Sequence, residues 1–172
     1  MEAIPKEVID MAEDFYVHLD AKEKKDILHK YYLEQPYIAE IHKGWLETIS
    51  YKGTIEKSEY MFFVIYRCYQ YYGIKLPIIT AITVRETFDR FMSNFKTDDE
   101  KPITNLETFI RLKTTLQQEY LLDYVILQIV KNDECPPQYT NEKDIHIISS
   151  QIRLLLWIFN NEIKNQLNKQ IN

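Results

Sequence analysis

Glycine is scarce in this sequence, with 3 glycines among 172 residues. So few glycines leave no room for the glycine-rich loops that cradle phosphate groups or for the Gly-x-Ser-x-Gly turn of serine hydrolases. A sheet-rich domain would also need more glycines for its turns, so the scarcity favours long helices. The sequence therefore carries no nucleotide-binding or nucleophile motif, and it favours a helical fold.

Cysteine is almost absent as well, because Cys68 and Cys135 are the only two. They are too few and too far apart for a zinc knuckle or a disulfide framework. We expect both to be reduced thiols, with Cys68 buried in a helix and Cys135 in a loop.

Long apolar runs and an excess of basic charge are also missing. No apolar run approaches the roughly 20 residues that a helix needs to cross a bilayer, and the N-terminus lacks the apolar core of a signal peptide. With a net charge of −5, the chain has no basic surplus of the kind that nucleic-acid-binding modules carry. We therefore expect a cytoplasmic protein that binds neither membrane nor nucleic acid.

Apolar residues recur at helical spacing along most of the chain. Clear stripes cover residues 4–19, 81–95, 109–130 and 148–167. A composition of 45% hydrophobic and 27% charged residues is typical of globular proteins. These features predict an all-α protein, a compact array of about seven helices in one domain over residues 1–172, with a weak subdivision near residues 96–103 as the alternative.

Local signals indicate where several helices begin and end. Asp20 and Glu23 have the spacing of a capping box, and Pro36 disfavours helical backbone at the residue before it. Gly73 suits the left-handed position that follows a helix. Further caps are expected at Thr54 or Ser58, and at Thr104 with Glu107.

The other helices should be organised around the segment 59–73. This segment is rich in tyrosine and phenylalanine and, as a helix, is apolar on nearly every side, which is typical of a helix that others surround. The link that follows it is short, so we expect the next helix, over residues 81–95, to pack antiparallel against it. The phenylalanines of that next helix should then face the central helix.

Charged residues inside apolar helices are the main candidates for a functional site. Arg67 and Arg153 have no acid at helical spacing, and Asp123 has no base. An unpaired buried charge is costly, so we expect these residues to meet in a polar network that tyrosine hydroxyls complete. The network could be a structural anchor or the wall of a ligand cleft, unless the guanidinium groups simply reach the surface. The candidate residues are Arg67, Asp123, Arg153, Glu119, Tyr66 and Tyr69.

Aromatic residues are the candidates for an interface. The chain has 13 tyrosines, and tyrosine and tryptophan are enriched at the energetic centres of protein interfaces. The candidates are Tyr71, Tyr72 and Trp157. Through Trp157, the long apolar stripe over residues 145–171 could dock a second copy of the chain and form a homodimer.

Metal binding is the alternative. Three acid–histidine pairs lie three or four residues apart and would share a helix face: Asp14 with His18, Asp26 with His29, and Glu142 with His146. No Glu-x-x-His or His-Glu-x-x-His motif accompanies them, and such pairs are ordinary on solvated helices.

The sequence thus predicts a non-enzymatic, cytoplasmic interaction module of regulatory, adaptor or immunity type, with an acidic, tyrosine-rich surface, a protein partner and no cofactor. A small metal-dependent helical enzyme is the alternative.

Overall fold

The computed structural model describes residues 3–50, 52–95, 118–130 and 142–171. Within these residues the chain forms helices and no strands, which confirms the predicted all-α array. The helices are α1 (Lys6–His18), α2 (Ala21–Glu34), α3 (Pro36–Leu46), α4 (Lys52–Tyr71), α5 (Ala81–Phe95), α7 (Glu119–Val130) and α8 (Glu142–Ile171). The predicted subdivision near 96–103, the Thr104–Glu107 capping box, the helix before residue 118 and the loop position of Cys135 lie outside the described residues.

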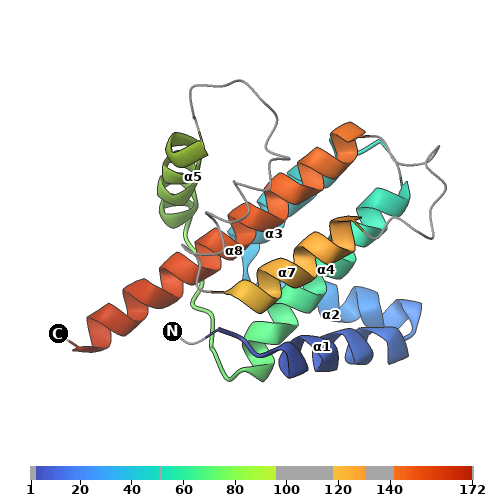
Figure 1. The fold of residues 1–172 in the computed structure, drawn as a ribbon, viewed down its shortest axis with the longest axis horizontal. Coiled ribbons are helices and arrows are strands. Elements are labelled where there is room, and N and C mark those ends of the chain that lie inside the picture. The colour runs from blue at the N-terminus through green and yellow to red at the C-terminus, as the bar shows by residue number, and fades with distance from the viewer. Residues whose placement is uncertain (1–2, 51, 96–117, 131–141, 172) are drawn as a thin grey trace.

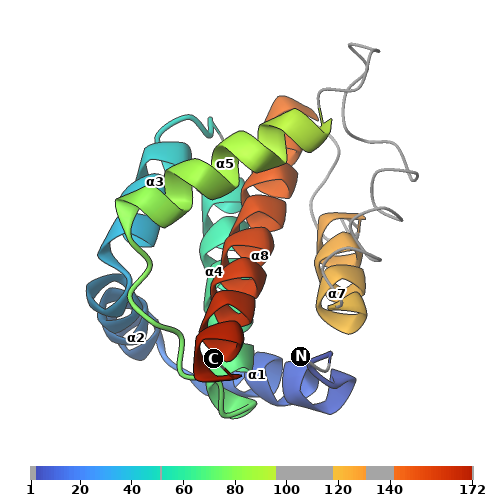
Figure 2. The same cartoon turned by 90° about the vertical axis from the view of Figure 1, so that its left-hand side faces the viewer.

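The long helix α8 crosses the whole molecule, and the other helices are arranged around it and α4 (Figure 1). Helices α3 and α5 pack against one side of α8, and α7 packs against α1, α4 and α8 (Figure 2). Helix α1 packs against α4, and α2 contacts both α3 and α4. None of the described helices is long and apolar enough to cross a membrane.

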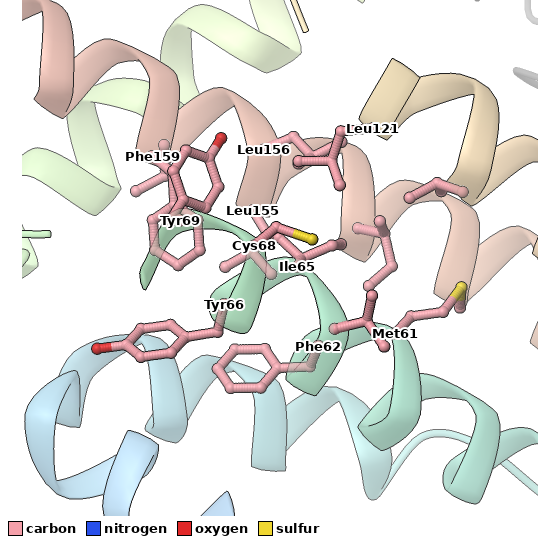
Figure 3. Packing of buried hydrophobic residues seen from close by; sticks show 14 of the residues in the cluster. Met61, Phe62, Ile65, Tyr66, Cys68, Tyr69, Leu121, Leu155, Leu156 and Phe159 are labelled. Carbon is pink, nitrogen blue, oxygen red and sulfur yellow. The ribbon is translucent and has the colours of Figure 1, made fainter. Parts of the chain in front are cut away.

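Helix α4 is the centre of the hydrophobic core, as the sequence predicts. Every residue from 61 to 66 is buried, and Cys68 and Tyr69 are buried as well. Figure 3 shows Ile65, Cys68 and Tyr69 on the side of α4 that meets α8, and Phe62 and Tyr66 on the opposite side, toward α2 and α3. Fully burying a side chain such as that of Phe62 stabilises the fold by about 1.5–3 kcal/mol. Such burial on two faces is what makes α4 the central helix.

Three of the local sequence signals are confirmed. The Asp20 carboxylate accepts hydrogen bonds from the amides of residues 22 and 23, and the Glu23 carboxylate accepts one from the Asp20 amide at 2.8 Å. Pro36 is the first residue of α3, directly after the break that ends α2. Gly73 follows α4 with φ of 76°. These contacts span at most a few residues, so the local sequence carries them.

The expected caps of α4 are wrong. The helix begins at Lys52, so Thr54 and Ser58 lie inside it, and both side chains are buried. Ser58 is used instead in a buried hydrogen bond to Gln151 of α8. A hydroxyl side chain inside a helix can serve a tertiary contact as well as a cap, and the local sequence does not distinguish the two uses.

The predicted packing of α5 on α4 is also wrong, since α5 packs against α8 and α3. The connection that leads to α5 is held by the buried side chain of Gln35. Its Nε2 donates to the Pro77 carbonyl at 2.7 Å, and the Ile79 amide donates to its Oε1 at 3.0 Å. These bonds fix the connection beside the junction of α2 and α3. The chain therefore does not turn straight back along α4.

Candidate functional site

A carboxylate with two donors on one oxygen lies where α2 ends beside α4. Glu34 Oε2 accepts a hydrogen bond from the Tyr66 hydroxyl at 2.9 Å and a longer one from Gln70 Nε2 at 3.5 Å. Burial, and then the bond to Glu34, raise the pKa of Tyr66, so its hydroxyl remains a donor at neutral pH. Tyr66 is buried and can turn little, so it holds the carboxylate in one orientation.

The amide of Gln70 is oriented from its other end. Its Oε1 accepts from Arg67 Nη1 at 3.0 Å and from the Tyr31 hydroxyl at 3.3 Å. Both donors require the amide oxygen to face them, which turns the amide nitrogen toward Glu34. Arg67 therefore acts on Glu34 through Gln70, and the network joins residues of α2 and α4.

The guanidinium of Arg67 also lies between two aromatic rings. Its Cζ is 4.5 Å from the centre of the Phe15 ring and 4.4 Å from that of Tyr71, within the range of cation–π attraction. Burial lowers the pKa of Arg67, but its phenol partners Tyr71 and Tyr31 raise it by more, so that it stays charged. Among the described residues Arg67 forms no ion pair, and its contacts lie on α1, α2 and α4 rather than at Asp123.

A pocket of about 460 Å³ opens over this network. Its polar lining comes from Glu34, Tyr66, Gln70 and Lys75, and its apolar lining from Leu33, Ile74, Leu76 and Ile78. The volume falls within the range of about 300–1,000 Å³ that is typical of small-molecule sites. An apolar pocket with a few converging polar groups is the usual form of such a site.

The remaining predicted network residues lie elsewhere. Arg153 on α8 is only 2% exposed, and burial lowers its pKa to about 10, so it stays charged at neutral pH. Tyr69 is fully buried in an edge-to-face contact with Phe159, and its hydroxyl has no hydrogen-bond partner among the described residues. Glu119 is exposed in the first turn of α7, and Asp123 is half-buried one turn later. Of the predicted set, the structure thus brings together Tyr66 and Arg67.

A second hydrogen-bond network, buried and absent from the sequence predictions, centres on His42 of α3. Nδ1 lies 2.7 Å from the Tyr32 hydroxyl, and Nε2 lies 3.1 Å from Ser58 Oγ. Because Ser58 donates to Gln151 Oε1, it accepts from Nε2–H, which leaves Nδ1 to accept from Tyr32. The ring stacks on Phe62 at 4.7 Å, and burial lowers the pKa of His42 to about 4. The imidazole is therefore neutral in the folded protein.

An open apolar groove of about 440 Å³ lies between α3, α5 and α8. Helix α3 contributes Tyr37, Glu40, Ile41 and Trp45; α5 contributes Ala81, Val84, Arg85 and Phe88; and α8 contributes Leu154. Two of its aromatic side chains, Tyr37 and Phe88, are each 43% exposed. The groove therefore presents apolar surface to solvent.

The aromatic interface candidates differ in their accessibility. Tyr71 is exposed at the end of α4 and stacks with Arg67, and Tyr72 is half-buried directly after it. Trp157 is only 8% exposed and belongs to the core. Little of its side chain is left for a partner to contact. Most of the described apolar stripe of α8 is likewise buried inside the monomer, at Ile148, Ile152, Leu155, Phe159 and Ile163.

The acid–histidine pairs resemble ordinary surface pairs where the structure describes them. His18 Nδ1 lies 2.7 Å from the Asp14 carbonyl and 3.5 Å from its carboxylate, and both side chains are largely exposed. Asp26 and His29 are exposed, and the side chains of Glu142 and His146 lie outside the described part. Within the described part, no three histidine, cysteine, aspartate or glutamate side chains are grouped so as to hold a metal ion.

Sequence reasoning missed Glu34, Gln70 and the exposed groove. Glu34 occupies the last position of a helix, where an acid usually faces water, and its donors come from residues 32 and 36 positions further along the chain. One signal for Gln70 was present in the sequence, because Gln70 stands at helical spacing from both Arg67 and Tyr66.

Comparison with protein-family models, curated proteins and solved structures found no match.

Proposed function

We propose that this protein is a non-enzymatic interaction module that receives an amphipathic helix of a partner protein in the groove between α3, α5 and α8. One observation carries the proposal: the groove is apolar, yet Tyr37 and Phe88 each expose 43% of their surface to solvent. Exposed apolar clusters of this kind commonly mark protein-binding surfaces. Two helices form its walls, which suits a third helix laid between them.

The charges on the groove walls indicate which partner helix fits. Glu40 stands on α3 and Arg85 on α5, so the two walls carry opposite charges. A complementary helix has apolar residues at three- and four-residue spacing along one face, with a basic residue on the side of Glu40 and an acidic residue on the side of Arg85. Such rim charges contribute mainly to orientation and to the rate of association.

The groove also has the residue types that dominate binding energy. Tyrosine, tryptophan and arginine are the most frequent hot-spot residues, and the groove contains Tyr37, Trp45 and Arg85. Truncating a hot-spot residue costs about 2 kcal/mol or more, which is roughly a thirtyfold loss of affinity. A single charged substitution in the groove should therefore abolish capture of a partner.

The test compares Phe88→Asp, in the groove, with Leu127→Asp, which changes an exposed leucine on α7 outside it. Affinity capture from the cells that make the protein should recover a partner with the wild type and with Leu127→Asp, and lose it with Phe88→Asp. Circular dichroism checks that both variants are folded, and light scattering shows whether the partner is a second copy of the chain. Equal recovery with both variants contradicts the docking groove.

A further inference from the structure

We propose that the pocket over Glu34 binds a small organic ammonium ion with an aliphatic body. The charged end pairs with the Glu34 carboxylate, and the aliphatic body lies against the apolar walls. Among the described residues the pocket shares no lining with the groove between α3, α5 and α8, so the two proposals rest on different side chains.

The hydrogen-bond pattern leaves one side of the carboxylate for a cation. Both donors, Tyr66 and Gln70, bind Oε2. Among the described residues, the nearest partner of Oε1 is the Lys30 ammonium at 4.0 Å, on a side chain that is largely exposed. A carboxylate oxygen accepts more than one hydrogen bond, so Oε1 can receive a closer ammonium.

The pocket walls select for a ligand that also has an apolar part. Leu33 and Ile78 are 69% and 68% exposed, and Ile74 and Leu76 continue the same lining. A hydrated metal ion would gain nothing from such walls, whereas an alkyl group is removed from water against them. Lys75 is the one cation among the described lining residues and is exposed, so its ammonium can turn toward solvent.

The network behind the pocket holds the carboxylate in place before a ligand arrives. Tyr66 is a buried donor, and Gln70 is turned toward Glu34 by its bonds from Arg67 and Tyr31. A site that is already ordered loses less conformational entropy on binding. Arg67 and Tyr31 are therefore positioning residues, because they act on the ligand only through Gln70 and Glu34.

The test uses three probes that share the isoamyl group: isoamylamine, isoamyl alcohol and 4-methylpentanoate. Two-dimensional NMR titration of the full chain should show millimolar binding of the amine, as expected for so small a molecule, with shifts at Leu33, Gln70 and Ile78. The alcohol should bind more weakly and the carboxylate not at all. Equal or tighter binding of the carboxylate overturns the proposal.

Two variants and a control separate the pocket from general attraction to an acidic protein. Glu34→Gln keeps an acceptor for Tyr66 and should weaken amine binding about tenfold or more, because a charge-assisted bond is lost. Glu86→Gln removes an exposed charge on α5 and should leave binding unchanged. Ile78→Ser should weaken binding by removing part of the apolar wall. If Glu34→Gln has no more effect than Glu86→Gln, or Ile78→Ser has none, the proposal is wrong.

Discussion

The buried imidazole of His42 should make the fold sensitive to mild acid. His42 is buried between α3 and α4, and its two nitrogens contact the hydroxyls of Tyr32 and Ser58. No carboxylate among the described residues contacts the ring, so nothing described there stabilises its protonated form. Protonation would also make Nδ1 a donor, so the Tyr32 hydroxyl would have to turn from donating to accepting.

The size of the effect follows from the pKa of His42. Burial lowers this pKa from 6.5, the value of an exposed histidine, to about 4. Below pH 6.5 the unfolded chain therefore binds a proton at His42 that the folded chain does not bind, and the free energy of unfolding falls as the pH falls. The loss continues down to about pH 4, where both states are protonated. At about 1.4 kcal/mol per pKa unit, it amounts to roughly 3 kcal/mol.

Urea unfolding followed by circular dichroism at several pH values between 7 and 4 measures this loss. The wild type should lose about 3 kcal/mol more over that range than His42→Gln, which cannot titrate at this position. His29→Gln, at an exposed histidine, should behave as the wild type does. If the free energies of the wild type and His42→Gln fall in parallel, burial does not lower the pKa of His42 as described.

Three further predictions concern local features. Gly73→Ala should lower the free energy of unfolding by about 1–2 kcal/mol, because φ is 76° there. Gly44→Ala should raise it by up to about 1 kcal/mol, because Gly44 lies inside α3 with open space around the added methyl. Thermal melts of the two variants and the wild type measure both effects. Asp20→Ala should cost about 1 kcal/mol in urea unfolding by removing the capping box, and Asp20→Ser should restore most of it. In a Cys135→Ser background, Cys68 should react with a thiol reagent only on unfolding, because burial raises its pKa to about 12; rapid labelling of the native protein would contradict this.

Features that depend on neighbouring residues could be predicted from the sequence. The Asp20–Glu23 capping box, the break before Pro36 and the left-handed Gly73 each depend on a few adjacent residues. The burial of α4 was predictable for a related reason, since a helix with apolar residues on every side must be covered on every side. The spread of apolar residues around the whole helix therefore identifies α4 as the central helix.

Tertiary contacts decided the features that the sequence did not reveal. The position of α5 depends on Gln35, which binds Pro77 and Ile79 more than forty residues further along the chain. Hydrophobic periodicity shows which face of a helix is apolar, but it does not name the helix that covers this face. The sequence therefore predicts helix α5 itself, but not that its neighbours are α8 and α3.

The candidate pocket likewise combines residues that the sequence indicates with a residue that only the tertiary structure reveals. Arg67 and Tyr66 could be selected from the sequence, the first as a charge inside an apolar helix and the second as a nearby tyrosine. Glu34 could not, because it acquires its role from α4 and from the connection after it. An acid at the end of a helix has no special signal until a second helix brings donors to it.

Photocrosslinking from the groove tests the proposed function most directly. Benzoylphenylalanine in place of Phe88 puts a reactive group at the mouth of the groove, and the same residue in place of Leu127 is the control on another exposed surface. Illumination of intact cells should yield a discrete protein adduct from position 88 and none from position 127. No adduct from position 88, or the same adducts from both positions, would contradict the docking groove.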